Sequence, residues 1–346
     1  ISNPLISNEQ FSFAQTPPSS IGEFSKEKFE ISYNPNIGGI VESFITFDLT
    51  PEYGESETLN EAVEISGIGV DLTDGIVYVP GEIPSIQQAI DASNNGDTIM
   101  VASGTYFENL EIPNKKISLI GENRETTIID GGGISSVINV WGTDAGDDVF
   151  ISGFTLQNGA GEPFAPHSGN ECGGGIFIAR LASPLLDNLI IQNNTVEGAG
   201  GGIFVEDGAV LRLSNSIVRN NEIGSGEQGG GIHMSGGTMG FVHNTEIYEN
   251  IAMNSGGGIY ADSPLYITNS IIRNNRCVNG TGNGLKARVY MYNCVVTQNG
   301  WISENESGNT GDHSMTVLSN SRIWNSIIWG NYGYSKIQNN QNVHID

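Results

Sequence analysis

The sequence predicts an all-β protein in which a solenoid of short parallel strands follows a smaller β-sandwich. The first observation is a Gly-Gly-Gly-Ile run, or a close variant, that begins at Gly173, Gly200, Gly229 and Gly256, with a degenerate copy at Gly282. The copies recur every 26 to 29 residues. A unit of this length cannot bury its own apolar face, so successive units must stack on one another.

The second observation is a pair of asparagine series that keep the same interval. The first series is Asn188, Asn215, Asn244, Asn269, Asn293 and Asn325, and the second, six residues later, is Asn194, Asn221, Asn250, Asn275, Asn299 and Asn331. The residues between them are short β-branched runs such as Ser216-Ile217-Val218, without helical periodicity. Each unit is therefore a coil of short parallel strands.

Stacking at a strand spacing of about 4.8 Å places equivalent residues above one another. The predicted interior ladder is Ile191, Val218, Ile247, Ile272, Val296 and Ile328. We expect the asparagines to satisfy backbone groups at turns, and the glycines to allow sharp turns with positive φ. A phosphate-binding loop would need a helix after the glycines, which the pattern does not contain.

The residues before the triplets carry a family resemblance. The runs Ile83–Ala92, Gly96–Val101, Ile117–Gly121 and Thr127–Gly132 resemble the opening of right-handed parallel β-helices of the pectin lyase-like superfamily. The resemblance implies a right-handed parallel β-helix over residues 76–346, with a short N-terminal helix whose Ile86, Ala89 and Ile90 cap the solenoid. That superfamily includes lyases, hydrolases, esterases, epimerases and non-catalytic surface proteins, so it indicates fold more than chemistry.

The later coils resemble a smaller group of β-helix proteins within that superfamily. The run Asn325–Asn331, with the glycine triplets, resembles secreted bacterial β-helix proteins that carry C-terminal sorting domains, which implies a secreted or cell-surface bacterial protein. No such domain follows, and no cap is recognisable before Asp346. We therefore expect a piece of a longer polypeptide, with its last strand edge covered by another domain or another protein chain.

The first 75 residues have a different pattern. Alternating apolar residues at Phe11 and Phe13, at Phe29 to Tyr33, at Ile45 to Leu49 and at Val63 to Ile65 predict short antiparallel strands. These strands, with Pro17-Pro18 and the run Ile65–Val70, resemble the later part of Hydin-type immunoglobulin-like modules. Residues 1–75 are therefore expected to form a partial immunoglobulin-like β-sandwich that serves as a spacer or a binding platform.

The chain is strongly acidic, with 39 acidic and 14 basic residues and a formal net charge of -25. Such a charge repels nucleic acid and anionic membrane surfaces. The acidity favours solubility, and calcium is the one cofactor that it suggests. The densest acidic cluster of the solenoid is Asp144, Asp147 and Asp148, which we take as a candidate calcium site although its spacing matches no known calcium loop.

Two further features limit the classes of protein to which the chain could belong. No apolar run approaches the roughly 20 residues that cross a bilayer, so membrane insertion is not predicted. Cys172, Cys277 and Cys294 have no metal-type spacing. Their odd number indicates that disulfides are not what stabilises this fold, and Cys294 stands in register with Ser216, Ser270 and Ser326 as a small packed residue.

Candidate site residues follow each glycine triplet. The second and fourth positions after the triplets are expected to point outward as neighbours along one cleft floor. These positions are Phe177, Ala179, Phe204, Glu206, His233, Ser235, Tyr260, Asp262, Lys286 and Arg288. Aromatic rings such as Phe177 and Phe204 would stack on sugar rings, and Lys286 and Arg288 would pair with uronate carboxylates. Glu206 and Asp262 are the further candidate substrate-binding residues.

Two kinds of chemistry are compatible with this row. For β-elimination, Lys286 is the candidate base, Arg288 neutralises the uronate carboxylate, and His233 or Tyr260 donates a proton. For hydrolysis, Glu206 and Asp262 would lie two coils or about 9.6 Å apart, near the upper limit for an inverting pair. Alternatively, Lys286 and Arg288 are solvated strand residues paired with Asp262. Polygalacturonase motifs and the residue set of a pectin methylesterase were not found in the sequence.

Two functions therefore remain open. The first is a non-catalytic extracellular solenoid of a multidomain surface protein, for adhesion, glycan binding or structural assembly. The second is a polysaccharide lyase or epimerase that acts on an acidic glycan. The predicted partners are an extracellular or cell-wall polysaccharide, or other protein chains at the solenoid ends. The immunoglobulin-like module and the incomplete catalytic set favour the non-catalytic function.

Overall fold

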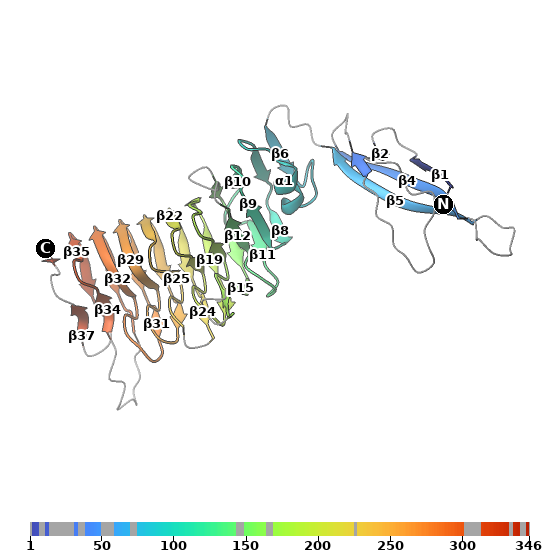
Figure 1. Cartoon of the computed structure of the whole chain (residues 1–346). Helices are drawn as coiled ribbons and strands as arrows, with labels where there is room; N and C mark the ends of the chain where they lie inside the picture. Colours follow the sequence, from blue (N-terminus) through green and yellow to red (C-terminus); the bar gives the residue numbers. More distant parts are fainter. Residues whose placement is uncertain are drawn as a thin grey trace.

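The computed structural model describes residues 75–142, 149–163, 169–224, 227–300 and 313–331. It also describes the strand residues 2–6, 11–13, 31–33, 39–49, 59–69, 335–339 and 344–345. From residue 75 onward the chain winds into a solenoid whose strands stack side by side from the α1 end toward β35 (Figure 1). The strand pairs of this stack are parallel, apart from one small antiparallel pair of β15 (Glu162–Pro163) with β16 (Glu171–Cys172).

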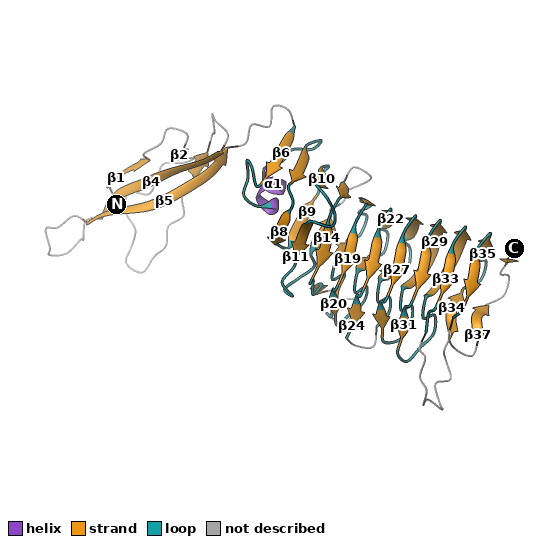
Figure 2. Ribbon diagram, turned by 180° about the vertical axis from the view of Figure 1, so that it is seen from behind, coloured by secondary structure: helices purple, strands orange, loops and turns teal. Residues whose placement is uncertain are grey.

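Each coil contributes strands to several parallel rows, visible as aligned arrows in Figure 2. The first row follows the glycine triplets and contains β9 (Leu110–Pro113), β12 (Ile138–Trp141), β17 (Ile176–Ile178), β21 (Ile203–Val205), β25 (Ile232–Met234), β34 (His313–Val317) and β37 (Ser335–Asn339). The second row contains β6 (Ile76–Val79), β7 (Thr98–Val101), β10 (Ser118–Gly121), β13 (Phe150–Ser152), β18 (Leu185–Asp187), β22 (Val210–Ser214), β26 (Met239–His243), β35 (Arg322–Trp324) and β38 (His344–Ile345). The long strands β29 (Ile259–Thr268) and β32 (Leu285–Tyr292) run through both rows.

Two further rows complete the coils. The third row lies between the asparagine series and contains β8 (Gly104–Phe107), β11 (Thr127–Asp130), β14 (Thr155–Gln157), β19 (Ile190–Gln192), β23 (Ile217–Arg219), β27 (Glu246–Tyr248), β30 (Ile271–Arg273), β33 (Val295–Thr297) and β36 (Ile327–Trp329). The short fourth row contains β20 (Thr195–Val196), β24 (Glu222–Ile223), β28 (Ile251–Ala252) and β31 (Arg276–Cys277).

The predicted interior ladder is confirmed. Strand pairing places Ile191, Val218, Ile247, Ile272, Val296 and Ile328 in successive register along the third row. All but Ile328 have no exposed surface, and they belong to one continuous apolar core inside the solenoid. Burial of such a stack is the main stabilising contribution, because each coil shields the apolar face of the next.

Helix α1 (Ile86–Ala92) lies at the first end of this core, as the sequence predicts. Ser85 caps the helix, since its side-chain oxygen accepts a hydrogen bond from the Gln88 backbone N–H at 3.2 Å. Ile86, Ala89 and Ile90 are buried and join the solenoid core. The helix therefore covers apolar surface that an open first coil would expose to water.

The two asparagine series have different roles. All six members of the first series adopt left-handed backbone, with φ from 44° at Asn325 to 54° at Asn293, and most are exposed. Some are bonded along the axis, as in Asn244 Nδ2 to Asn215 Oδ1 at 2.7 Å. This row closes the tight turn between the second and third strand rows, because asparagine tolerates positive φ better than most residues.

The second asparagine series is a buried ladder. Asn194, Asn221, Asn250, Asn275 and Asn299 have no exposed surface. From Asn221 onward, each side-chain oxygen accepts from the backbone N–H and the side-chain amide of the asparagine in the preceding coil, as in Asn250 Oδ1 with Asn221 N at 3.1 Å and Asn221 Nδ2 at 3.0 Å. Each amide also donates to a carbonyl of the preceding coil, for example Asn250 Nδ2 to Val218 O at 2.9 Å. The polar groups buried at this corner therefore have hydrogen-bond partners, as buried amides generally do.

The glycine triplets combine sharp turning with close contact between coils. The first glycine of each copy has positive φ, for example 67° at Gly200 and 76° at Gly229, as predicted. The second glycine is needed for a different reason: a Cβ at Gly201 would lie 2.5 Å from the carbonyl oxygen of Gly230 in the next coil. Neighbouring coils therefore approach each other there at a distance that excludes any side chain.

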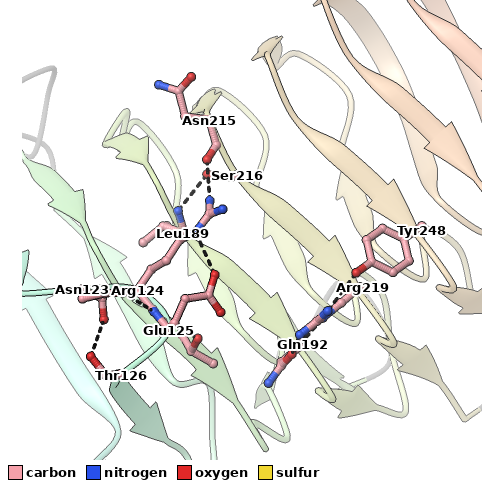
Figure 3. Close-up of polar contacts among 11 residues, drawn as sticks. Asn123, Arg124, Glu125, Thr126, Leu189, Gln192, Asn215, Ser216, Arg219 and Tyr248 are labelled. Carbon is pink, nitrogen blue, oxygen red and sulfur yellow. Dashed lines mark hydrogen bonds and ion pairs between the residues drawn. The ribbon is translucent and has the colours of Figure 1, made fainter. Parts of the chain in front are cut away.

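Smaller side chains fasten neighbouring coils at the first turn. Leu189 N donates to Ser216 Oγ at 3.1 Å, and Cys294 N donates to Ser326 Oγ at the equivalent turn. Cys294 thus occupies the position of the serines, as predicted. All three cysteines are buried, and none forms a disulfide within the described residues. Figure 3 shows a longer link, in which Arg124 reaches from a loop of an early coil to the carbonyl oxygen of Asn215 at 2.9 Å.

The N-terminal strands form separate antiparallel sheets. They are β1 (Ser2–Ile6), β2 (Phe11–Phe13), β3 (Ile31–Tyr33), β4 (Gly39–Leu49) and β5 (Leu59–Gly69), paired in the order β1-β4-β5 and β2-β3. The expected antiparallel strands are thus found. The immunoglobulin-like assignment and the domain boundary at residue 75 stay predictions.

Candidate functional site

The residues of the predicted cleft floor are neighbours along the solenoid, as expected, but they do not line an open cleft. Strand pairing puts Phe177, Phe204, His233, Tyr260 and Lys286 in successive register. Their rings stack at centroid distances of 5.2 Å from Phe177 through to Tyr260. However, the four rings are 6%, 0%, 3% and 8% exposed. The expectation of an open aromatic surface was therefore wrong, and we call these five residues the buried stack.

The segment that precedes each glycine triplet covers this stack. Cys172 and Ala199 pack with Phe177 and Phe204 in a small apolar cluster outside the main core. Burial there raises the pKa of the Cys172 thiol to about 12. His233 Nδ1 lies 3.2 Å from the carbonyl oxygen of Gln228, which belongs to the covering segment of the same coil. The side chains do point away from the solenoid interior, but the chain folds back over them and forms a second core.

The proposed proton donors are buried, and the proposed base Lys286 is half-buried beside them. Tyr260 donates its hydroxyl hydrogen bond to Asp262 Oδ1 at 2.7 Å, and burial together with this carboxylate raises the Tyr260 pKa above its usual value. The Lys286 ammonium lies 5.5 Å from the centre of the Tyr260 ring and 3.4 Å from Ser255 Oγ. A tyrosine with a raised pKa and a hydrogen-bonded carboxylate is a stable pair rather than a reactive one.

Arg288 does not follow the expected register. A shift in pairing between β29 and β32 places Arg288 opposite Pro264 instead of Asp262. The Arg288 side chain is half-buried, and its Nε has no hydrogen-bond partner among the described residues. Glu206 accepts a hydrogen bond from the Arg180 backbone N–H at 2.8 Å. The irregularity at Asp262 and Ser263 therefore separates Arg288 from the position that sequence spacing assigns to it.

The candidate calcium ligands Asp144, Asp147 and Asp148 lie outside the described residues. Across the ranges that the structure does describe, no three His, Cys, Asp or Glu side chains form a metal-binding group. In the same ranges, no helix is long and apolar enough to cross a membrane. The calcium site stays a prediction.

A second, exposed row of side chains lies on the outer face of the second strand row. It consists of Leu185, Arg212, Phe241, Tyr266, Tyr290 and Arg322, which pair in successive register, and we call it the outer row. Phe241 is 40% and Tyr266 36% exposed. Their rings stack at 5.3 Å, and Tyr266 and Tyr290 stack at 4.8 Å.

Sequence reasoning missed this row, although the sequence contains its signal. Each member stands three residues before an asparagine of the first series, as Phe241 does before Asn244 and Tyr266 before Asn269. The predicted cleft residues all lie on or directly after the strands that follow the glycine triplets, one strand row away from the outer row. Alternation along β22 and β26, with Leu211 and Leu213 buried and Arg212 outward, would have identified the outer face.

A hollow of about 370 Å³ lies at one end of the outer row. Phe150 and Phe241 stand at its two ends in register, with the smaller Leu185 and the Arg212 side chain between them. Arg212 lies low along the sheet, since its Nη1 donates to the carbonyl oxygen of Ser183 at 3.1 Å. The volume falls within the range of small-molecule sites in proteins, roughly 300 to 1,000 Å³.

The neighbouring outward positions supply polar groups to this hollow. Asp187, Ser214 and His243 pair in register beside the outer row and line the hollow. Asp187 Oδ1 accepts from Ser214 Oγ and from Asn215 Nδ2, both at 2.7 Å. His243 Nδ1 lies 2.8 Å from Thr268 Oγ1. An apolar surface with a few fixed polar groups at one edge is the usual composition of a ligand site.

Comparison with known proteins agrees with the fold. Residues 136–346 match the model of the family described as right handed beta helix region. A probable pectinesterase/pectinesterase inhibitor 17 of Arabidopsis thaliana is 30% identical over 125 residues, which are 33% of this chain and 24% of that protein. The chain thus spans about a quarter of the length of the curated relative that it matches.

Several solved structures are similar at low sequence identity. Pectate lyase Pel9A is 16% identical with a TM-score of 0.46, covering 78% of this chain and 73% of that one. A pectin methylesterase in complex with hexasaccharide VII is 11% identical with a TM-score of 0.44, covering 78% and 92%. Pectin methylesterase PemA from Erwinia chrysanthemi is 13% identical with a TM-score of 0.40, covering 75% and 80%. Because the family model matches more than half of the chain, this protein belongs to the right-handed β-helix family.

Proposed function

We propose that this chain is a non-catalytic extracellular β-solenoid that binds a polysaccharide through its outer row. The observation that carries the proposal is the contrast between two aromatic rows. The buried stack is closed off from any polymer, whereas Phe241 and Tyr266 are exposed and Tyr290 is half-buried, all in line on an outer sheet face. A polysaccharide is itself a linear repeat, so a straight row of amphipathic rings on a rigid scaffold suits it.

Other features support the same proposal. Stacking fixes the aromatic side chains before any ligand binds, which lowers the entropy lost on binding. The named curated relative is a pectinesterase, so its printed name also points to a polysaccharide partner. A secreted or cell-surface location, with residues 1–75 as an immunoglobulin-like spacer, completes the proposal; the resemblance of the sequence to secreted bacterial β-helix proteins supports it.

The lyase alternative requires a reactive Lys286 beside an accessible proton donor. His233 and Tyr260 are buried, and the Tyr260 hydroxyl is engaged by Asp262. A uronan could reach this set only if the covering segments moved away. We therefore retain Lys286, Arg288, His233 and Tyr260 as residues to be tested for turnover and not as the preferred site.

The test uses affinity electrophoresis of the whole chain through gels that contain one polysaccharide each. We expect retardation by at least one polysaccharide, and its loss in the double variant Tyr266→Ala with Tyr290→Ala. The matched control is Trp329→Ala, which removes an aromatic ring that is 69% exposed on β36 in a different strand row. Retardation that is unchanged in the double variant, or lost equally in the control, would overturn the outer row as the binding surface.

A further inference from the structure

The hollow beside Phe241 has the features of a binding subsite for one sugar ring, and this inference rests on the proposed polysaccharide-binding function. Tyr266 covers one face of the Phe241 ring, and the hollow lies on the opposite side, toward β22. Among the described residues, Phe241 therefore ends the aromatic stack and has a ring face that no aromatic neighbour occupies. Tyr266 is stacked on both sides, so it offers mainly its edge and hydroxyl.

The shape of the hollow follows from side-chain size along the register. Phe150 and Phe241 are separated by three strand spacings, or about 14 Å. Leu185 and Arg212 fill the floor between them but are shorter or lie flat against the sheet. The result is a concave step on a surface that would otherwise be a continuous ridge. A pyranose ring has one apolar face of C–H groups, which suits an aromatic ring with aliphatic neighbours.

The polar edge of the hollow favours hydroxyl groups. Ser214 and Asn215 both donate to Asp187 Oδ1, so the carboxylate is held in place. The second oxygen, Oδ2, makes no hydrogen bond to the part of the chain that the structure describes. A carboxylate only accepts hydrogen bonds, and sugar hydroxyls are donors that match it. His243 lines the hollow beside the same position.

Charge decides between a neutral and an acidic sugar. Arg212 and Asp187 line the hollow with one positive and one negative charge, so the hollow has no net charge from this pair. The chain as a whole carries a formal net charge of -25, which opposes the approach of a polyanion. We propose that the hollow lined by Phe241, Leu185, Arg212 and Asp187 binds an uncharged pyranose residue of a polysaccharide chain, with its apolar face on Phe241 and its hydroxyls on Asp187.

The experiment is isothermal titration of the whole chain with neutral oligosaccharides of gluco, manno and galacto configuration, and in parallel with oligogalacturonate. We expect one neutral series to bind. Phe241→Ala and Asp187→Asn are each expected to weaken its binding about tenfold or more, the range of a central interface contact. Asn at position 187 keeps an acceptor for Ser214 but loses the charge, so the fold is preserved. Trp329→Ala is the control and is expected to bind as the parent does.

The outcomes separate this inference from the function on which it depends. Tighter binding of oligogalacturonate than of every neutral series would overturn the neutral-sugar assignment. Binding of a neutral series that Phe241→Ala and Asp187→Asn leave unchanged would overturn the hollow as the subsite, while the polysaccharide-binding function would stand. Absence of binding to any saccharide would overturn both. Unfolding midpoints of each variant, compared with the parent, identify any loss that comes from misfolding.

Discussion

At the scale of single residues, the two asparagine series show how one residue type performs two tasks. Asn250 is fully buried and exchanges hydrogen bonds with both neighbouring coils, whereas Asn244 is exposed and is needed mainly for its backbone angle, φ 46°. Sequence spacing treats the two positions alike, because both recur at the same interval. Burial distinguishes them, and it predicts different consequences of substitution.

We expect Asn250→Ala to lower the free energy of unfolding by at least about 2 kcal/mol, because it leaves buried backbone and amide groups without partners. Asn244→Gly is expected to be nearly neutral, since glycine adopts positive φ without strain. Urea unfolding monitored by circular dichroism measures both. Equal losses at the two positions, or a larger loss at Asn244, would contradict the assignment of the second series as the buried ladder.

Asp130 provides a pH-dependent contribution to stability. Burial raises its pKa, but hydrogen bonds from Gln157, the Gly132 N–H and Asn158 outweigh burial and hold the pKa below the usual 3.8. Because the folded-state pKa is depressed, the stabilisation is complete above the unfolded-state value. It is lost as the pH falls through the folded-state value.

We therefore expect the urea midpoint of the parent protein to fall more steeply below a pH of about 4 than that of Asp130→Asn. Asp207→Asn, at an exposed turn, is the matched control and is expected to follow the parent. The midpoints are measured at a series of pH values from neutral downward. Parallel curves for the parent and Asp130→Asn would show that the hydrogen bonds to this carboxylate do not shift its titration.

At the scale of the structural element, the coil is the unit that the sequence predicts well. A constant interval indicates stacking, and stacking determines which residues become neighbours, so the interior ladder and the turn residues could be predicted. The interval does not show which loop folds over which outer face. Phe177 and Phe204 point outward as expected, yet the segment that contains Ala199 covers them. The irregular pairing at Asp262 is likewise invisible to spacing.

Because each coil contacts only its neighbours, a whole coil is expected to be removable. Deleting residues 222–250 joins Asn221 to Ile251, and Glu222 pairs with Ile251 in the structure, so each ladder stays in register. We expect this variant to fold with an unchanged circular dichroism spectrum per residue. Its free energy of unfolding is also expected to fall less steeply with urea concentration, since unfolding exposes less surface.

Deletion of residues 222–236 is the matched control. It removes about half a coil and places interior residues on the outer face, so we expect it not to fold cooperatively. A folded control, or an unfolded whole-coil deletion, would contradict the modular description of the solenoid.

At the scale of the whole molecule, the solenoid is a rigid scaffold that presents different side chains on each outer face. One face is closed by the buried stack and its covering segments. Another face, the outer face of β18, β22 and β26, presents the outer row with its hollow. Solenoids present extended surfaces that suit polymeric partners. The stacked strands keep the outer-row side chains in line without any conformational change.

The most direct test measures binding and turnover in the same samples. A panel of neutral and uronate-containing polysaccharides, with and without calcium, is incubated with the whole chain; bound protein and absorbance of unsaturated products are both followed. We expect binding to at least one polysaccharide, reduced in the Tyr266→Ala with Tyr290→Ala variant, with no product formed. Formation of unsaturated product that disappears in Lys286→Ala would contradict a non-catalytic solenoid and establish the lyase alternative.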